Sequence, residues 1–139
     1  MDNITLVVKS MPINNGLVRA VVASYAGRLN PTMEVLSDIK TAVSEAVTNA
    51  IIHAYDGSAD NDICINASID GNTLAVKVTD YGKGILNIVD AMRDFYTTKS
   101  SEERSGLGFT IMSSFMDSID VKSSEGEGTT VTLTKKLRD

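Results

Sequence analysis

Hydrophobic residues recur along the first part of the chain with two different spacings. The run from Ile4 to Val8, ITLVV, is short and rich in β-branched side chains, which is typical of a strand that is buried or paired. Residues 16–29, GLVRAVVASYAGRL, instead place their apolar side chains at helical spacing. The pattern therefore predicts a strand followed by a helix.

A second helix is predicted to start near residue 30. Asn30 is a candidate N-cap, Pro31 suits the first helical position and Glu34 falls in the first turn. At about 100° per residue, Asn49 lies at the edge of the apolar stripe, Glu45 lies further out, and the single histidine, His53, lies nearer the stripe. We therefore expect His53 to be packed or hydrogen-bonded rather than a ligand. The stripe itself is the expected core face, and consists of Val35, Leu36, Ile39, Ala42, Val43, Ala46, Val47, Ala50 and Ala54.

In most of the remaining chain, apolar and polar residues alternate as they do in strands. One long polar segment interrupts this pattern. Residues 62–69 and 73–79 indicate a hairpin joined through Asp70-Gly71-Asn72. Residues 80–109 contain four glycines and are interpreted as a binding loop or lid, with the lid at roughly residues 90–105. Helical spacing resumes at Leu107, and two final strands flank a turn at residues 125–128. This order predicts a single domain, residues 1–139, with an α/β two-layer sandwich (α+β) whose helices cover one face of a mixed, largely antiparallel sheet.

Charge and composition narrow the classes of function. A net charge of −5 and a pI near 4.8 argue against a nucleic-acid partner, because binding a phosphate backbone requires clustered basic residues. The sequence has no apolar run of about 18 residues and no N-terminal signal pattern, so we expect a cytoplasmic protein with no membrane partner. The single cysteine, Cys64, is expected to be a small buried hydrophobic residue.

Glycines cluster at three places: DYGKG (80–84), RSGLGF (104–109) and GEGTT (126–130). A glycine pair that opens a helix offers free backbone N–H groups to a phosphate, and we expect RSGLG to lie at such a start, with Arg104 adding a positive charge. Neither the common P-loop motif nor the triplets of the usual protein kinases occur. The glycine clusters therefore indicate a nucleotide site of another design.

Four segments, SEAVTNAIIHAY, DYGKGI, ERSGLGFTIM and GEGTTV, resemble in order and separation the ATP-binding boxes of the superfamily that contains gyrase, Hsp90, histidine kinases and MutL. The resemblance spans roughly residues 34–134. Within that superfamily the chain is most similar to the anti-sigma factors that are serine kinases, of the sigma-F type. The resemblance implies a Bergerat ATP-binding fold and a protein serine kinase that uses Mg²⁺ and ATP. Such a protein binds and inhibits a sporulation sigma factor and phosphorylates a serine on its anti-anti-sigma antagonist.

The resemblance also implies roles for single residues. Glu45 would act as general base toward the incoming hydroxyl, and Asn49 would bind Mg²⁺ through its amide oxygen. Asp80 would accept the adenine amino group with support from Thr129, and Gly82 and Gly84 would leave room for the base. The phosphates of ATP or ADP would be held by Arg104, Ser105, Gly106, Leu107 and Gly108, with Lys99 as a further contact.

Partner contacts are implied in the same way. Arg19, on the first helix, matches a partner-binding arginine of the family, and a homodimer is implied, with which the apolar ITLVV edge is compatible. Other interpretations stay open: a sigma-B-type stress-response kinase, a histidine-kinase ATPase domain, or a sigma-binding module without catalysis. The sequence argues against the histidine-kinase interpretation, because no acceptor histidine precedes the motif helix. Without the glycine boxes, Glu45 and Asn49 would be read as a solvated helix face.

Overall fold

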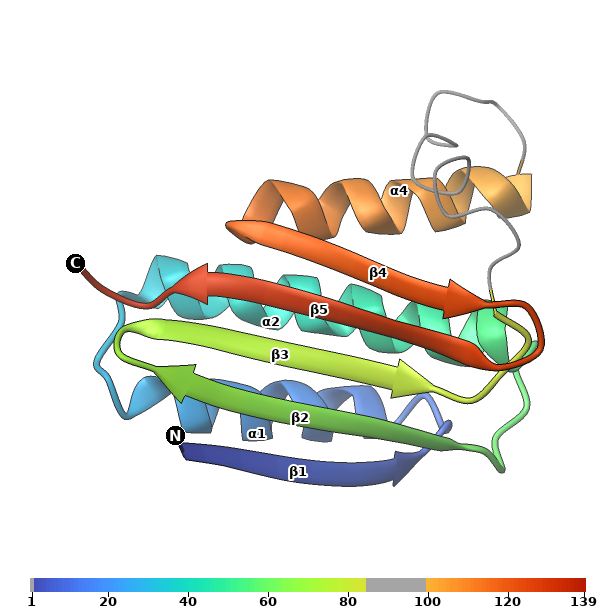
Figure 1. Cartoon of the computed structure of the whole chain (residues 1–139), viewed down its shortest axis with the longest axis horizontal. Coiled ribbons are helices and arrows are strands. Elements are labelled where there is room, and N and C mark those ends of the chain that lie inside the picture. Colours follow the sequence, from blue (N-terminus) through green and yellow to red (C-terminus); the bar gives the residue numbers. More distant parts are fainter. Residues whose placement is uncertain (1, 85–99) are drawn as a thin grey trace.

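The computed structural model describes residues 2–84 and 100–139, with side chains at 2–84 and 108–139. One sheet has the strand order β1-β2-β3-β5-β4, and each neighbouring pair runs antiparallel (Figure 1). Its strands are β1 (Asp2–Lys9), β2 (Asp62–Asp70), β3 (Thr73–Asp80), β4 (Ser118–Ser124) and β5 (Gly128–Lys136). The helices are α1 (Asn14–Gly27), α2 (Met33–Asn49), the π-helix η1 (Ala50–Ala54) and α4 (Ser100–Phe115).

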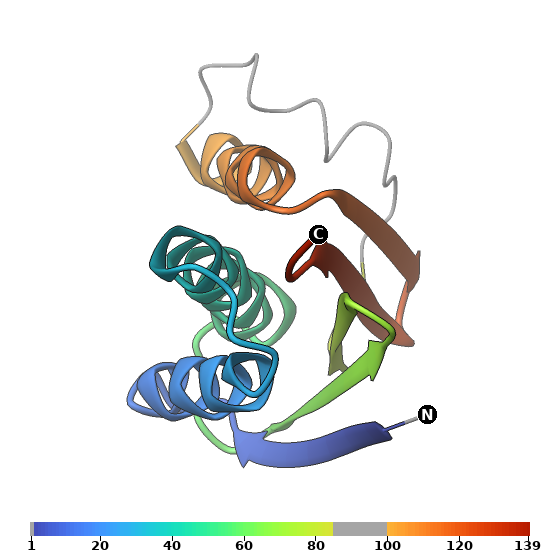
Figure 2. The ribbon, with the colours of Figure 1, turned by 90° about the vertical axis from the view of Figure 1, so that its left-hand side faces the viewer.

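The helices pack on one face of the sheet, and no element of the described chain covers the other face (Figure 2). Strand alternation explains this arrangement, because every second residue of β2 and β3 is buried against the helices. The apolar stripe of α2 faces the same core, and the side chains of Ile39, Val43 and Val47 are completely buried. The predicted two-layer fold is confirmed.

The start of α2 differs from the sequence prediction. Thr32, not Asn30, is the N-cap, and its side-chain oxygen accepts a hydrogen bond from the backbone N–H of Val35 at 3.1 Å. Asn30 has a φ of +53°, the left-handed conformation that asparagine tolerates better than most residues. Asn30 therefore belongs to the turn after α1, and the prediction that it caps the second helix is wrong.

The position of Cys64 also differs from the prediction. Cys64 lies on the face of β2 away from the helices, opposite Val7 on β1 and Thr79 on β3, and is only partly buried. The alternation of β2 explains this, because Ile63 and Ile65 on either side of it point into the core. Cys64 is thus a residue of the open sheet face.

Helix α4 begins at Ser100, earlier than the sequence pattern suggested. The prediction that the glycine pair opens a helix is wrong, because Gly106 and Gly108 lie within α4. In the sequence, Ser100 stands three residues before Glu103, which is a helix start signal that the glycines obscured. Residues 90–99 of the predicted lid lie outside the described residues, whereas residues 100–105 are helical. Over the described residues, no helix combines the length and the hydropathy needed to cross a membrane.

Candidate functional site

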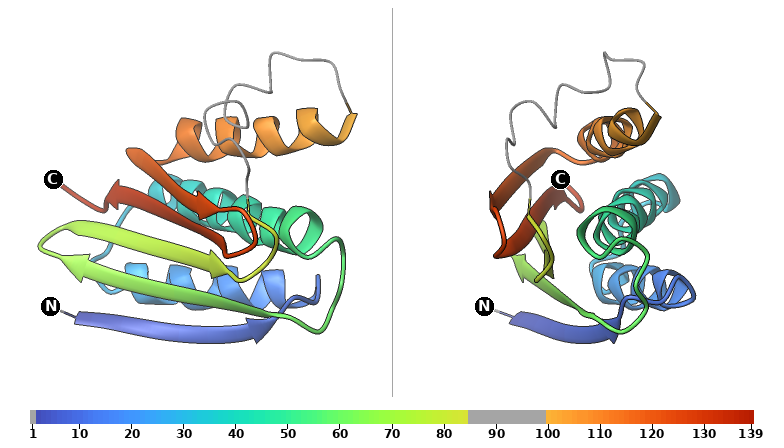
Figure 3. Two further views of the ribbon diagram at one scale, coloured as in Figure 1. Left: turned by 45° about the vertical axis from the view of Figure 1, so that its right-hand side comes forward. Right: turned by 90° about the vertical axis from the view of Figure 1, so that its right-hand side faces the viewer.

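Four segments that are far apart in the sequence meet at one end of the molecule. They are the end of α2 with η1, the end of β3, the turn between β4 and β5, and the first half of α4 (Figure 3). Helices α2 and α4 lie side by side and run in opposite directions, so α4 begins where α2 ends (Figure 1). This packing brings the motif helix together with all three glycine clusters.

Asn49 and Gly108 are in close contact where α2 crosses α4. A β-carbon at Gly108 would lie 3.0 Å from Nδ2 and 3.1 Å from Oδ1 of Asn49, so the glycine gives the amide its room. The Nδ2 atom of Asn49 is buried and has no hydrogen-bond partner among the described residues. A buried amide that the protein leaves unsatisfied costs free energy, which a ligand at this position could recover.

The chemistry of the Asn49 amide fits Mg²⁺, a hard cation that takes oxygen ligands. The described part of the chain holds no cluster of three or more His, Cys, Asp or Glu side chains that could bind a metal alone. Magnesium commonly takes one or two protein ligands and fills its remaining positions with phosphate oxygens and water. The residues present therefore fit a magnesium ion that arrives with a phosphate compound.

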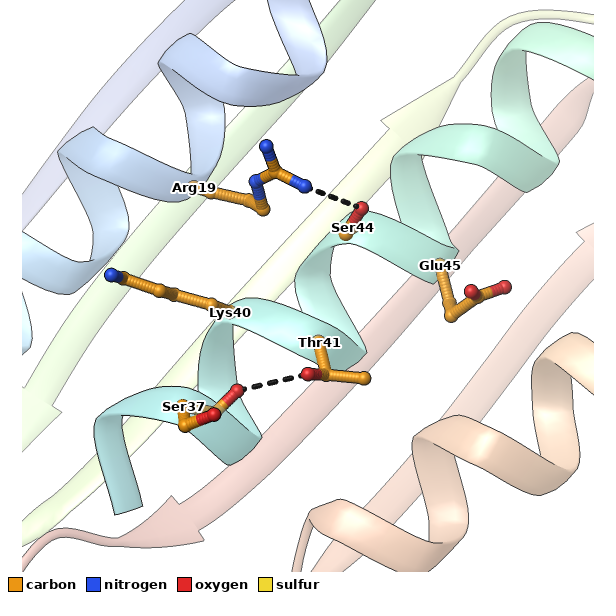
Figure 4. Close-up of a pocket in the computed structure, with 6 residues that line it drawn as sticks. All are labelled: Arg19, Ser37, Lys40, Thr41, Ser44 and Glu45. Atoms are coloured by element: carbon orange, nitrogen blue, oxygen red, sulfur yellow. Dashed lines mark hydrogen bonds between the residues drawn. The ribbon is translucent and has the colours of Figure 1, made fainter. Parts of the chain in front are cut away.

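Glu45 lies one helical turn before Asn49 and is half-buried. Its carboxylate is on the side of α2 that faces α4, whereas Ser44 points toward α1 (Figure 4). Burial raises the pKa of the Glu45 carboxyl above its ordinary value. A carboxylate with a raised pKa at the edge of such a site has the properties of a general base.

Asp80, the last residue of β3, is a buried carboxyl with neutral partners. Its Oδ1 accepts the backbone N–H of Gly82 at 3.0 Å, and the backbone N–H of Thr129 on β5 also donates to it. Burial raises the pKa of Asp80, and these two N–H groups offset part of the rise. The hydroxyl of Thr129 forms a 2.7 Å hydrogen bond with that of Ser123. Asp80 is therefore held in one position, as an acceptor that reads a ligand must be.

Glycines are required at two of the predicted positions. A β-carbon at Gly82 would overlap the carbonyl of Ala54 at the end of η1, and one at Gly84, whose φ is +77°, would overlap the carbonyl of Ser124. Gly128, which had no predicted role, is a third such position, because a β-carbon there would overlap the carbonyl of Asp80. These glycines let the backbones of η1, β3 and the β4–β5 turn approach each other around Asp80.

Some predicted phosphate-binding residues cannot be placed in the same detail. Lys99 lies outside the described residues. Arg104, Ser105 and Leu107 lie on α4, where the structure describes only the backbone, and Gly106 lies on the same turn. Gly108 is the one member of this group that is seen to contact the motif helix.

Arg19 lies on α1, away from the glycine segments, and faces a polar hollow beside Glu45. Its Nη1 donates to the Ser44 hydroxyl at 3.5 Å (Figure 4). The hollow is lined by Arg19, Ser37, Lys40, Thr41, Ser44 and Glu45. Arg19 and Lys40 give it positive charge, although the protein as a whole is acidic.

Tyr55 is a further residue at this end of the molecule that had no predicted role. Its hydroxyl donates to the carbonyl of Asp62 and accepts the backbone N–H of Tyr81, both at 2.6 Å. A tyrosine at the end of a helix gives no signal of such a contact, because the partners lie 7 and 26 residues away. His53 lies within η1 and is half-buried.

Comparison with known proteins shows the family. The histidine kinase-like ATPase domain matches residues 9–135. An anti-sigma F factor of Thermoanaerobacter sp. (strain X514) is 51% identical over 124 residues, covering 89% of this chain and 86% of that protein. An anti-sigma F factor of Anoxybacillus flavithermus is 47% identical over 124 residues, covering 89% of this chain and 85% of that protein.

Among solved structures, the RsbU and RsbW domains of a Mycobacterium tuberculosis protein match with a TM-score of 0.71 at 20% identity. The match covers 99% of this chain and 32% of that one, and it supports the fold alone. The chain belongs to the histidine kinase-like ATPase domain family and, within it, to the anti-sigma F factors.

Proposed function

We propose that this protein is an anti-sigma factor that binds Mg²⁺ and ATP and transfers the γ-phosphoryl group to a serine of an antagonist protein. The observation that supports it most strongly is the Asn49 amide, buried against Gly108: its Nδ2 has no partner among the described residues and could donate to a phosphate oxygen, with the amide oxygen turned to the metal. The family description and the names of the relatives support the same proposal. ADP would occupy the site after transfer.

In this proposal one group of residues binds the adenine base and another binds the phosphates with Mg²⁺. Asp80 accepts the adenine amino group, and Thr129 and Gly82 hold the carboxylate through their backbone N–H groups. Asn49 offers its amide oxygen to Mg²⁺, which when bound offsets the negative charge of the phosphates. Gly108 keeps α4 close enough for its N-terminal half to line the phosphate side.

Glu45 is the proposed general base. It would accept the proton of the serine hydroxyl as that oxygen attacks the γ-phosphorus and the bond to the β-phosphate oxygen breaks. Burial raises its pKa, which makes the carboxylate a stronger base than an exposed glutamate. Because the hollow beside Glu45 is open to solvent, the acceptor protein has a route to it.

A direct test uses the purified protein with Mg²⁺, γ-labelled ATP and a lysate of its host. We expect one small labelled polypeptide that carries phosphoserine, and we expect no label with Glu45→Gln. If the unaltered protein binds both ATP and sigma factor but labels nothing, the protein is a nucleotide-dependent binding module. A labelled histidine would instead indicate a histidine kinase.

Arg19 is the proposed contact for the sigma factor. Its guanidinium is exposed, and within the described residues its one hydrogen bond is the long one to Ser44, so it is available to a partner. We expect Arg19→Ala to weaken sigma binding by about tenfold or more, since arginines are frequent hot spots in interfaces. Binding of ATP should stay unchanged. Arg138→Ala, which alters an exposed arginine at the C-terminus, is the control.

A homodimer is the proposed assembly. Strand β1 is at the edge of the sheet, and Val7 on its open face is 56% exposed although it is apolar. Sedimentation equilibrium of the unaltered protein and of Val7→Glu tests this. We expect a dimer for the first and a larger monomer fraction for the second.

A further inference from the structure

The end of η1 is joined by two hydrogen bonds and one ion pair to the segment that follows Asp80. The Tyr55 hydroxyl accepts the backbone N–H of Tyr81 at 2.6 Å, and the backbone N–H of Lys83 donates to the carbonyl of Ala54 at 3.3 Å. The side chains of Lys83 and Asp56 form an ion pair at 3.0 Å. We call these three contacts the η1 latch. They join the helix that carries Glu45 and Asn49 to the strand end that carries Asp80.

The π-helical turn explains why Tyr55 can reach this position. The backbone N–H of Tyr55 donates to Ala50 at 3.2 Å, five residues earlier, where an α-helix would use the residue four earlier. The wider turn ends the regular α spacing at Asn49, so His53 does not continue the Glu45–Asn49 row. Tyr55 is buried, and its hydroxyl spans the start of β2 and the end of β3.

The Tyr55 hydroxyl is the strongest part of the latch. Lys83 and Asp56 have side chains that are 61% and 76% exposed, and ion pairs so exposed contribute little. The Lys83 to Ala54 bond is long at 3.3 Å. By contrast, the two bonds of Tyr55 are 2.6 Å and partly buried, and burial raises the pKa of Tyr55, so the hydroxyl keeps its proton at neutral pH.

The latch acts on Asp80 through adjacent peptide groups. The N–H of Tyr81 is held by Tyr55, and the N–H of the next residue, Gly82, donates to the Asp80 carboxylate. If the first N–H loses its partner, the peptide that carries the second is free to tilt. The Asp80 carboxylate then loses one of its two backbone donors.

We propose that Tyr55 is a positioning residue for nucleotide recognition, whose hydroxyl sets the distance between the adenine acceptor Asp80 and the helix that bears Asn49. This inference rests on the proposed function, because it takes Asp80 to be the residue that reads the base. It assigns base selectivity partly to a side chain that does not touch the nucleotide.

The test compares two buried tyrosines at opposite ends of the sheet, each of which donates its hydroxyl to a backbone carbonyl. Tyr55→Phe removes the hydroxyl of the latch. Tyr25→Phe removes a hydroxyl that donates to the Asp2 carbonyl at 2.9 Å, at the far end of the sheet. Calorimetric titration with Mg²⁺·ATP and Mg²⁺·GTP gives both affinity and base selectivity. Circular dichroism fixes a temperature at which both variants are folded.

We expect Tyr55→Phe to bind ATP about three- to tenfold more weakly, which corresponds to one buried hydrogen bond, because of the two bonds that are lost only the one from the Tyr81 N–H acts on Asp80. GTP binding should change less, so the ratio of the two affinities falls. In transfer assays KM for ATP should rise while kcat changes little. Tyr25→Phe should leave the affinity, the ratio and KM unchanged.

Several results would overturn the inference. Unchanged ATP affinity in Tyr55→Phe, an equal loss for ATP and GTP, or an equal effect of Tyr25→Phe would reduce Tyr55 to a residue of general stability. A second variant, Asp56→Asn, removes the exposed ion pair and tolerates the positive φ of +51° at that position. It should weaken ATP binding by less than about twofold. A larger loss than that of Tyr55→Phe would contradict the conclusion that the Tyr55 hydroxyl is the strongest contact of the latch. Absence of ATP binding by the unaltered protein would refute the proposed function itself.

Discussion

Helix α2 has two faces with opposite chemistry. The inner face packs on the sheet through residues that are no more than 2% exposed, namely Ile39, Ala42, Val43, Ala46 and Val47. The outer row, at i, i+4 spacing, is polar throughout and consists of Ser37, Thr41, Glu45 and Asn49. The inner face gains stability from burial, whereas the outer row includes a carboxyl with a raised pKa and an amide whose nitrogen has no partner within the described residues.

This difference separates residues that hold the fold from residues that we propose bind a ligand. A helix selected for stability alone would not keep a desolvated carboxylate and an unsatisfied amide one turn apart. Packing of the inner face fixes the position of the helix, and this in turn fixes the positions of the side chains of the outer row. Changes to the two faces should therefore affect different measurements.

The largest expected effect comes from Glu45→Gln. Removal of a general base should lower the rate of phosphoryl transfer by about 10²- to 10⁴-fold at saturating ATP. The melting temperature should stay equal or rise, because an ionised half-buried carboxylate is lost. Glu34→Gln, which alters an exposed glutamate in the first turn of the same helix, is the control. Transfer at the unaltered rate by Glu45→Gln would remove Glu45 from the mechanism.

Ile39→Ala should give the opposite pattern. Ile39 is completely buried on the inner face, so the change leaves a cavity and should lower the free energy of unfolding by about 2–5 kcal/mol. Urea denaturation measures this loss. ATP affinity per folded molecule should be unchanged, and a specific loss of ATP binding would mean that the two faces are not independent.

A pair of glycine substitutions sharpens the comparison. Gly108→Ala places a β-carbon 3.0 Å from the Asn49 amide nitrogen, whereas at Gly16 on α1 the nearest atom, Nη2 of Arg19, is 3.7 Å away. Both changes favour a helix by roughly 1 kcal/mol. We expect Gly108→Ala to weaken the binding of Mg²⁺·ATP about three- to tenfold, since a small displacement of the Asn49 amide from its binding position is costly. Gly16→Ala should raise stability without affecting the affinity for ATP. If Gly108→Ala and Gly16→Ala bind ATP equally well, Asn49 lies away from the nucleotide.

The smallest expected effect is a shift in pH dependence. Because the pKa of Glu45 is raised in the folded protein, the acidic limb of kcat/KM should lie above the ordinary glutamate value of 4.5. The effect of pH on the free energy of unfolding through Glu45 has the opposite sign to that of a carboxylate that stabilises the fold. The folded state binds this proton more tightly than the unfolded state does, so protonation of Glu45 favours folding as pH falls through the raised pKa.

The stability gain of Glu45→Gln should therefore be full above the raised pKa of Glu45 and should shrink as pH falls below it toward 4.5. Thermal melts of both proteins across that range measure it. A gain that grows as pH falls would have the wrong sign.

Periodicity predicted most of the fold. The stripe of α2 and the alternation of β2 and β3 are strong local signals, because each buried face has the period of its own element. Asn30 and the start of α4 were predicted wrongly, because several residues near each boundary carry start signals of similar strength. Cys64 was misplaced because residue type was given more weight than the position of Cys64 in the strand pattern.

The candidate site was predicted only in part, and mainly from the resemblance to a family. The resemblance pointed to Asn49, Asp80 and the glycine segments, and the structure brings these together. It could not reveal the close approach of Gly128 to Asp80 or the contacts of Tyr55, because these depend on how β3, β5 and η1 meet. Local sequence patterns describe single elements, whereas such contacts arise only from tertiary packing.

The most direct test of the role of the outer row is the Mg²⁺ dependence of ATP affinity in the unaltered protein and in Asn49→Ala. Calorimetric titration with ATP, with Mg²⁺ present and with the metal chelated, gives both values. We predict that Mg²⁺ strengthens ATP binding to the unaltered protein by about tenfold or more and has little effect on the variant. An equal gain from Mg²⁺ in both proteins would contradict the assignment of Asn49 as the metal ligand and, with it, the interpretation of the outer row as a nucleotide site.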